Sequence, residues 1–212
     1  MLQKWIVRLI PLEAFALAAL LGWALTGALH LGAQERSDSA ITSPGVLSPV
    51  FTPEVQYWQD NILSWSQTYA LDANLIATVM QIESCGDPNA ISRSGAQGLF
   101  QVMPFHFAFG EDTLDPDTNA ARGLAYLSQG LALSGNEVGL ALAGYNGGHS
   151  QIGVDSRLWP DETRRYYYWG TGIYADATSG AAHSERLDEW LTAGGTSLCA
   201  RAAAQLQIVN SQ

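Results

Sequence analysis

The sequence has very little positive charge. Ten Lys and Arg residues stand against 20 Asp and Glu, the formal net charge is −10, and Lys4 is the single lysine. Electrostatic binding to nucleic acid or to anionic lipid headgroups needs clustered cations, so we expect no nucleic-acid partner. A glycan remains compatible with this composition, because sugars are recognised by hydrogen bonds and apolar surfaces, and the chain has seven Trp and eight Tyr.

Histidine and cysteine are also scarce, which limits metal chemistry. The four histidines are scattered along the chain: His30, His106, His149 and His183. No group of His and Cys has metal-site spacing, so we expect no metal and no other cofactor. The two cysteines are Cys85 and Cys199. In an oxidising compartment they could form a disulfide that ties the C-terminal tail to the middle of the chain, and the sequence leaves both states open.

The longest apolar run lies close to the N-terminus. Lys4 and Arg8 precede a largely apolar stretch over residues 10–31, which is about the length of a hydrocarbon crossing. Because positive residues favour the cytoplasmic side, the chain after residue 31 would lie on the extracytoplasmic side of the membrane. We predict that residues 1–33 form a membrane anchor. An uncleaved anchor is preferred to a removed signal segment, since the run is long and the cleavage site near its end is poor.

Composition and periodicity divide the rest of the chain. Residues 34–52 are rich in Ser, Thr, Pro and Gly and predict a flexible linker. The alternative is that its last apolar residues pack onto the domain: Val46, Leu47, Val50 and Phe51. A folded domain is expected over residues 53–178 and a helical tail over 179–212. Apolar residues follow helical spacing through both, so the predicted fold class is mostly α.

Helix start and stop signals locate the individual helices in the sequence. Apart from the segment described next, helices are predicted from Pro53 to about Tyr69, from a cap at Thr118 or Asn119, from Glu137 to Tyr145, and from Pro160 onward. The tail, His183 to Ile208, reads as one or two amphipathic helices interrupted at Gly194-Gly195.

The segment from Leu75 to Pro104 is the most informative in the chain. Behind Asp72, a good N-cap residue, apolar residues follow helical spacing and predict a buried helix that ends at Glu83. A Gly and a Pro stop the helix just beyond. The negative end of the helix dipole and partly dry surroundings both favour the protonated carboxyl group. Glu83 therefore has the properties of a general acid, although a solvated Glu paired with Arg93 would fit the same spacing.

Three sequence blocks, in order, resemble a known family. They are Ile82-Glu83-Ser84 followed by Gly95 to Pro104, then Ala143 to Gly148, then Glu162 to Tyr166. The stretch over residues 53–176 resembles the lytic transglycosylases related to the soluble bacterial enzyme, whose catalytic domain is similar to goose-type lysozyme. The resemblance implies a single lysozyme-like catalytic domain behind the N-terminal anchor. It also implies cleavage of peptidoglycan between N-acetylmuramic acid and N-acetylglucosamine, with a 1,6-anhydromuramoyl product.

The resemblance further implies the roles of individual residues. Glu83 would be the catalytic acid and base. The substrate-binding residues would be Ser84, Gln101, Met103, Tyr145, Asn146 and Tyr166. The blocks contain one candidate catalytic carboxylate, which suits attack by the C6 hydroxyl of the substrate in place of water. The sequence departs from the family pattern at Phe100, Gly144 and Gly147, which bears on subsite preference.

Two other functions stay open at this point. A lysozyme-like muramidase would hydrolyse the same bond with a positioned water, and a non-catalytic peptidoglycan-binding envelope protein would keep the scaffold without the chemistry. In each case the expected location is the extracytoplasmic side of the cytoplasmic membrane of a bacterial envelope, as a single-pass protein, or secretion if residues 1–33 are removed. Peptidoglycan strands and the membrane are the expected partners, and the sequence names no protein partner.

Overall fold

The computed structural model describes residues 46–208, most of which are helical. The α-helices are α1 (Pro53–Gln56), α2 (Gln59–Tyr69), α3 (Ala73–Glu83), α4 (Pro116–Leu133), α5 (Val138–Gly147), α6 (Asp161–Thr178), α7 (Glu185–Trp190) and α8 (Thr196–Leu206). Short 3-10 turns occur at η1 (Pro104–His106), η2 (His149–Gly153) and η3 (Ser156–Leu158), and a π turn, η4 (Leu191–Gly195), joins α7 to α8. The prediction of a mostly α fold is confirmed.

The predicted anchor, residues 1–33, lies outside the described residues, as does most of the predicted linker. Within residues 46–208, no helix combines the length and apolarity needed to cross a membrane.

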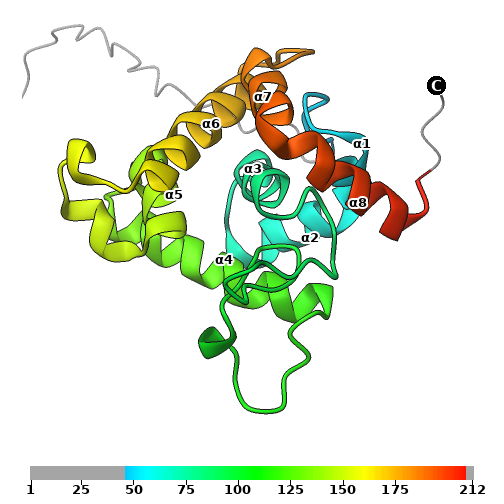
Figure 1. Ribbon diagram of the computed structural model, residues 1–212, viewed down its shortest axis with the longest axis horizontal. Coiled ribbons are helices and arrows are strands. Elements are labelled where there is room, and N and C mark those ends of the chain that lie inside the picture. Colours follow the sequence, from blue (N-terminus) through cyan, green and yellow to red (C-terminus); the bar gives the residue numbers. More distant parts are fainter. Residues whose placement is uncertain (1–45, 209–212) are drawn as a thin grey trace, which may run out of the picture. The chain divides into compact units, whose positions relative to one another are not determined.

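Helix α3 lies at the centre of the fold, with the other helices around it (Figure 1). It begins as the sequence predicts, because the Asp72 carboxylate accepts a hydrogen bond of 3.0 Å from the backbone N–H of Leu75. Its residues Leu75 to Gln81 are all buried. Burial of an apolar helix on all sides is the main stabilising term for such an element. The helix also ends at Glu83, as predicted.

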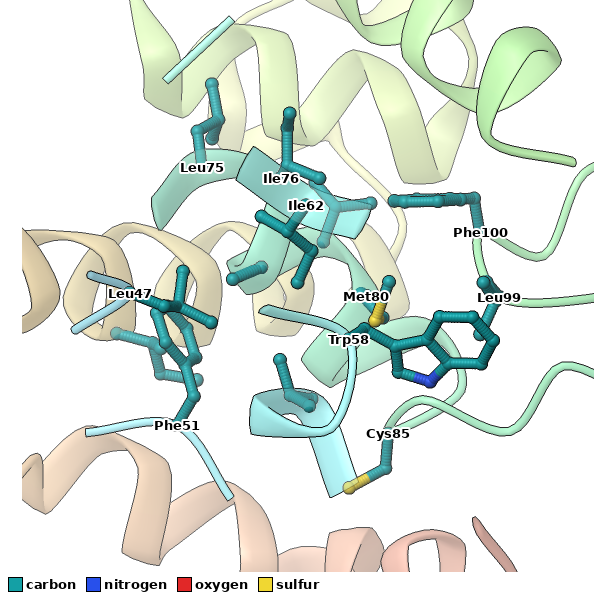
Figure 2. Packing of buried hydrophobic residues seen from close by; sticks show 14 of the residues in the cluster. Leu47, Phe51, Trp58, Ile62, Leu75, Ile76, Met80, Cys85, Leu99 and Phe100 are labelled. Atoms are coloured by element: carbon teal, nitrogen blue, oxygen red, sulfur yellow. The ribbon is translucent and has the colours of Figure 1, made fainter. Parts of the chain in front are cut away.

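The N-terminal part of the described chain belongs to the core. Leu47, Val50 and Phe51 are buried, and Figure 2 shows Leu47 and Phe51 among the side chains around α3. The backbone N–H of Ser48 donates to Asn74 Oδ1 at 3.1 Å. Three of the four residues of the packed alternative are therefore buried, whereas Val46 is exposed, and the packed part of the chain begins before residue 53.

Two predicted helices differ in the structure, one by an interruption and one by its cap. The helix predicted from Pro53 is interrupted at Tyr57 and Trp58, so that α1 and α2 are separate. Helix α4 is capped by Asp115, whose carboxylate accepts from the Thr118 N–H at 2.9 Å. Asn119 is not a cap but is fully buried, and its side chain holds the loop that precedes α4.

The C-terminal tail folds as predicted, with a break at Gly194. This glycine has φ of 136°, a backbone conformation that L side chains rarely adopt, and it separates α7 from α8. Helix α7 packs on α6, and α8 returns to contact α1 (Figure 1). The tail thus comes to lie beside the first elements of the domain.

Candidate active site

Glu83 lies at the C-terminal end of α3, near side chains supplied by two other helices. Tyr145 from α5 and Tyr166 from α6 are close enough to interact with its carboxyl group. Glu83 as a residue is half-buried. A general acid needs both conditions, since the carboxyl group must be dry enough to hold its proton and still be reachable by a substrate.

The surroundings of Glu83 favour its neutral form. Burial raises the pKa of Glu83 from 4.5 to about 8. The nearby Tyr166 hydroxyl lowers this pKa in part, and the negative charge of Glu162 raises it further. Desolvation is the largest cause, so the carboxyl group is mainly protonated at neutral pH. This is the protonation state that a glycosidic oxygen requires from its proton donor.

Tyr166 supplies a neutral hydroxyl beside this acid. Its side chain is buried, and the hydroxyl has no hydrogen-bond partner of normal length among residues 46–208, although it is near enough to Glu83 to affect its pKa. Burial and the proximity of Glu83 raise the pKa of Tyr166 well above its usual value. The hydroxyl therefore keeps its proton. It is available to donate to a substrate oxygen or to the Glu83 carboxylate formed after proton transfer.

A pocket of about 270 Å³ adjoins this group of residues. Its lining residues are Gln101, Val102, Met103, Phe105, His106, Gly123, Tyr126, Tyr145, Asn146, Gly147 and Gly148. Tyr145 lines the pocket and also lies near Glu83, although neither Glu83 nor Tyr166 is among the lining residues. Four of the predicted substrate-binding residues line this pocket: Gln101, Met103, Tyr145 and Asn146.

Two amides give the pocket a complementary pair of polar groups. The Gln101 amide nitrogen donates to the backbone carbonyl groups of Ala90 (3.1 Å) and Gly98 (2.9 Å), which leaves its carbonyl oxygen as an acceptor. The Asn146 carbonyl oxygen accepts from the Thr163 hydroxyl at 3.0 Å, which leaves its NH₂ group as a donor. One acceptor and one donor suit the hydroxyl and acetamido groups of an amino sugar.

Tyr145 forms a fixed wall of the pocket. Its hydroxyl donates to the Phe100 carbonyl oxygen at 2.8 Å. Gly123 of α4 permits this approach, because a Cβ there would lie 2.9 Å from the Tyr145 hydroxyl and 2.6 Å from the Phe100 Cβ. The orientation of the ring is thereby set by two neighbouring segments.

Ser84 is placed differently from the expectation. The residue is fully buried, and its hydroxyl donates to the Leu99 carbonyl oxygen at 2.7 Å and accepts from the Gly86 N–H at 3.0 Å. Both partners are backbone groups: Gly86 belongs to the turn that follows α3, and Leu99 belongs to a loop 15 residues after Ser84 along the chain. In this arrangement Ser84 cannot reach a sugar, so we correct the predicted substrate-binding role to one of holding the turn.

Aromatic residues that the sequence analysis did not select form one side of the pocket. The Tyr126 ring stacks on His149 with centroids 3.9 Å apart, and the His106 centroid lies 4.9 Å from Tyr126. The exposed Phe105 ring is 4.5 Å from His106. Desolvation and the nearby His149 lower the pKa of His106, which favours the neutral imidazole. Phe105 and His106 lie in an irregular segment with no periodicity, so no sequence pattern pointed to them.

The remaining carboxylates near Glu83 have other surroundings. Asp87 accepts from the Asn89 N–H at 2.9 Å and thereby stabilises the turn after α3. Glu162 is exposed in the first turn of α6, where acids are favoured by the helix dipole. The negative charge of Glu162 nevertheless contributes to the raised pKa of Glu83.

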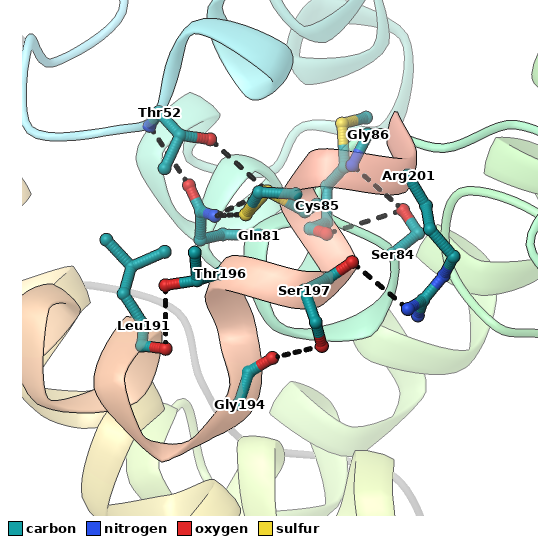
Figure 3. The surroundings of a disulfide bond; sticks show 12 residues. Thr52, Gln81, Ser84, Cys85, Gly86, Leu191, Gly194, Thr196, Ser197 and Arg201 are labelled. Carbon is teal, nitrogen blue, oxygen red and sulfur yellow. Dashed lines mark hydrogen bonds between the residues drawn. A yellow bond between two sulfur atoms is a disulfide. The ribbon is translucent and has the colours of Figure 1, made fainter. Parts of the chain in front are cut away.

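The two cysteines are joined by a disulfide behind the site (Figure 3). Cys85 and Cys199 have Cα atoms 5.0 Å apart, and the bond connects the turn after α3 to α8. Together with the Glu54 carboxylate, these sulfur atoms form the one cluster of possible metal ligands found in the described part of the chain. Sulfur atoms bonded to each other offer no thiolate, so this cluster is not a metal site.

Comparison with known proteins agrees with this geometry. Residues 60–165, half of the chain, match the transglycosylase SLT domain family. The transglycosylase of Enterobacteria phage PRD1 is 37% identical over 111 residues, which cover 51% of this chain and 40% of the phage protein. The membrane-bound lytic murein transglycosylase C of Edwardsiella ictaluri is 38% identical over 84 residues, which cover 32% of this chain and 23% of that protein.

A solved structure is also similar. An inactive mutant of the lytic transglycosylase Slt from Pseudomonas aeruginosa matches with a TM-score of 0.42 and 22% identity, covering 70% of this chain and 24% of that chain. The chain spans less than half the length of these relatives.

The chain belongs to the transglycosylase SLT domain family, because the family match extends over half of its length. The resemblance of the three sequence blocks is thereby confirmed. The family match ends at residue 165, so it includes Glu83, the pocket and the start of α6 but not α7 or α8.

Proposed function

We propose that this protein is a peptidoglycan lytic transglycosylase with Glu83 as its catalytic acid and base. The observation that carries the proposal is the environment of Glu83: a half-buried carboxyl group with its pKa raised to about 8, next to a pocket with free amide groups. A carboxyl group kept neutral beside a cleft is what protonation of a glycosidic oxygen needs. Membership of the family supplies the bond that is cut.

The reaction would proceed in two proton transfers through the same residue. Glu83 donates its proton to the oxygen that leaves C1 of N-acetylmuramic acid, and the bond between C1 and that oxygen breaks. The resulting Glu83 carboxylate then takes the proton of the C6 hydroxyl while O6 bonds to C1. The product is the 1,6-anhydro sugar, no water is consumed, and Glu83 returns to its protonated state. An internal nucleophile avoids the entropy cost of positioning a second molecule.

The other residues of the site would orient the sugar and stabilise the changing charge on Glu83. The Gln101 carbonyl oxygen and the Asn146 NH₂ group are free to bind polar groups of the ring. Met103 and Tyr145 form apolar walls of the pocket. The Tyr166 hydroxyl, which lacks a partner in the described residues, would donate to the Glu83 carboxylate when it forms. The proposal thus gives each of these predicted residues a role except Ser84.

One observation favours a second candidate, a muramidase that hydrolyses the same bond. Glu162 is exposed, and its negative charge reaches Glu83, so a second carboxylate is near the site. A hydrolase with two carboxylates would use this residue to activate water. Its place in the first turn of a helix, where acids are common, favours a structural role instead. A binding protein without activity is the third possibility, and the raised pKa of Glu83 argues against it.

We also propose that residues 1–33 anchor the protein in the cytoplasmic membrane, with residues 46–208 on the extracytoplasmic side. The supporting observations are the apolar run and the positive residues before it. Relatives named membrane-bound lytic murein transglycosylases are consistent with attachment to the envelope.

Mass spectrometry of the soluble products from purified peptidoglycan tests the proposed function. A lytic transglycosylase releases muropeptides that are lighter by one water than the reducing-end products of a hydrolase. We expect the lighter products from the wild-type chain and none from Glu83→Gln. Reducing-end products would establish the muramidase instead, and sedimentation of the protein with sacculi without soluble products would establish the binding protein.

A further inference from the structure

Two segments outside the family match meet on α3 behind the catalytic residue. One is the chain just before α1, which contains Thr52, and the other is α8, which contains Cys199. Both converge on Gln81 and Cys85, which lie two residues before and two residues after Glu83. Figure 3 shows these side chains gathered around the disulfide. We call Thr52, Gln81, Cys85 and Cys199 the clasp.

The clasp is a closed set of polar contacts in the interior. Gln81 is fully buried, and its carbonyl oxygen accepts from the Thr52 N–H at 3.1 Å. The amide nitrogen of Gln81 donates to the sulfur atoms of Cys85 (3.1 Å) and Cys199 (3.6 Å). The Thr52 hydroxyl lies 3.3 Å from the Cys85 sulfur. A buried amide that is satisfied by three segments fixes their relative positions.

The backbone held by the clasp is in an uncommon conformation. Cys85 has φ of 53° and Gly86 has φ of 84°, so the chain takes two successive left-handed residues directly after Glu83 and Ser84. A non-glycine residue rarely adopts this conformation unless its surroundings require it. The Trp58 indole N–H also donates to the Gly86 carbonyl oxygen at 2.9 Å. The end of α3 is therefore held by tertiary contacts in addition to its local turn, in which the Cys85 N–H donates to the Met80 carbonyl oxygen at 3.0 Å, and the disulfide is the covalent one of these contacts.

We propose that Gln81 and Cys199 are positioning residues for the transglycosylase reaction. Through the clasp, the C-terminal helix α8 holds the end of α3 so that the Glu83 carboxyl group stays close to Tyr145 and Tyr166. Neither residue contacts the pocket, since Gln81 and Cys199 are buried on the far side of α3. Catalytic groups must be held to within a fraction of an ångström, so support from behind affects turnover more than substrate binding. This inference rests on the proposed function.

Reduction of the disulfide tests the inference without any mutation. The chain has only two cysteines, so a thiol reductant acts on this bond alone. We expect the reduced full chain, assayed on soluble glycan strands below its melting temperature, to lose about tenfold or more in kcat while KM changes little. We also expect the alkaline limb of the pH profile to move to lower pH, because a looser helix end lets water reach Glu83 and its pKa falls.

Two variants and a control separate positioning from folding. Cys199→Ser should reproduce the reduced protein and show no further response to reductant, and Gln81→Met should lower kcat with the disulfide intact. Arg201→Ala is the matched control on α8 and should leave kcat unchanged, because within residues 46–208 the exposed Arg201 side chain bonds only to the Ser197 carbonyl oxygen (3.0 Å). Circular dichroism and thermal melting show that each protein is folded at the assay temperature.

The outcomes distinguish this inference from the proposed function. An unchanged kcat and pH profile in the folded, reduced protein would overturn the inference and leave the disulfide with a stabilising role only. Loss of activity in proportion to the unfolded fraction would do the same. If the oxidised protein releases no anhydro product, the proposed function fails, and ¹³C NMR titration of Glu83 still decides the inference. The clasp predicts a lower pKa for Glu83 after reduction, and an equal pKa would contradict it.

Discussion

At the C-terminal end of α3, the polar groups on the two sides of the helix differ in whether they have hydrogen-bond partners. On the rear side, the polar atoms of Gln81 and Ser84 all have protein partners. On the side of the cleft, the Tyr166 hydroxyl has no partner within the described residues and the Glu83 carboxyl group is held in its neutral form. A buried polar group without a partner costs stability, and on the side of the cleft a bound substrate can supply the missing partner. Hydrogen bonds on the rear side fix the end of the helix. On the side of the cleft, the Tyr166 hydroxyl and the Glu83 carboxyl group stay available to a substrate.

The largest effect on activity should come from replacing Glu83, which lies on the side of the cleft. Glu83→Gln keeps the size of the side chain but removes the proton that is donated, so we expect activity to fall by about a thousandfold or more. Thermal stability should stay equal or rise, because a buried ionisable group is replaced by a neutral one. Product release from peptidoglycan and a melting curve measure the two effects. Turnover near the wild-type rate would remove Glu83 from the mechanism.

On the rear side, loss of the disulfide should mainly show as lower stability. The bond closes a loop with a sequence separation of 114 residues. Removal of a native disulfide in a small domain typically costs about 2–5 kcal/mol. Denaturant titration of Cys199→Ser against the wild-type protein gives this number. An equal free energy of unfolding would show that the other contacts of α8 suffice.

The pH dependence of stability should reflect the raised pKa of Glu83. In the folded protein this carboxyl group binds its proton up to pH about 8, whereas in the unfolded chain it ionises near its usual value. Between these two values the folded state binds more protons, so Glu83 makes stability fall as pH rises, by at most about 1.4 kcal/mol per pH unit. Unfolding curves for wild type and Glu83→Gln over this range test the sign. The variant should show a flatter dependence, and parallel curves would contradict the raised pKa.

A pair of hydroxyl deletions contrasts the two sides directly. Ser84→Ala removes a group that bridges two backbone atoms in the interior, and we expect a loss of about 1–3 kcal/mol in stability. Tyr166→Phe removes a hydroxyl without a normal partner, so stability should change little while activity falls. Because the Tyr166 hydroxyl lowers the pKa of Glu83, that pKa should rise in Tyr166→Phe. The comparison breaks down if both variants lose the same stability and keep the same activity.

The smallest effect on activity should come from replacing Glu162. Its charge is a minor cause of the raised pKa of Glu83, so Glu162→Gln should shift the alkaline limb of the activity profile slightly to lower pH and leave the products unchanged. Thr163→Ser on the same helix is a control for local packing. Abolished activity in Glu162→Gln, with reducing-end products from the wild-type protein, would favour the muramidase.

The sequence predicts the central helix well because local signals and burial agree there. The Asp72 cap, the apolar spacing and the turn after Glu83 are all local features, and α3 has the predicted limits. The tail is predicted for the same reason, since Gly194 interrupts an otherwise regular pattern. The family resemblance supplied Gln101, Met103, Tyr145 and Asn146, which the structure brings to one pocket.

Features that depend on tertiary contacts were not accessible from the sequence. Ser84 is next to Glu83 along the chain, but the position of Leu99 decides that the Ser84 hydroxyl faces inward. Asn119 looked like a helix cap, whereas its amide serves the Phe100 and Gln97 backbone across the loop. The stacking of Tyr126 on His149 joins residues of different elements. In each case the partner is distant in sequence, and no periodic pattern records it.

The covalent link between Cys85 and Cys199 also bears on how the molecule withstands proteases. The stretch from η1 to the start of α4 is exposed at Phe105, within η1, and at Phe109, in the loop that follows, and exposed loops are the usual sites of proteolytic nicking. This segment lies within the ring that the disulfide closes. A single cut there would leave both fragments attached to each other, so the nicked molecule would migrate as one piece until a reductant is added. The bond that joins the end of α3 to α8 thereby also keeps a damaged chain in one piece.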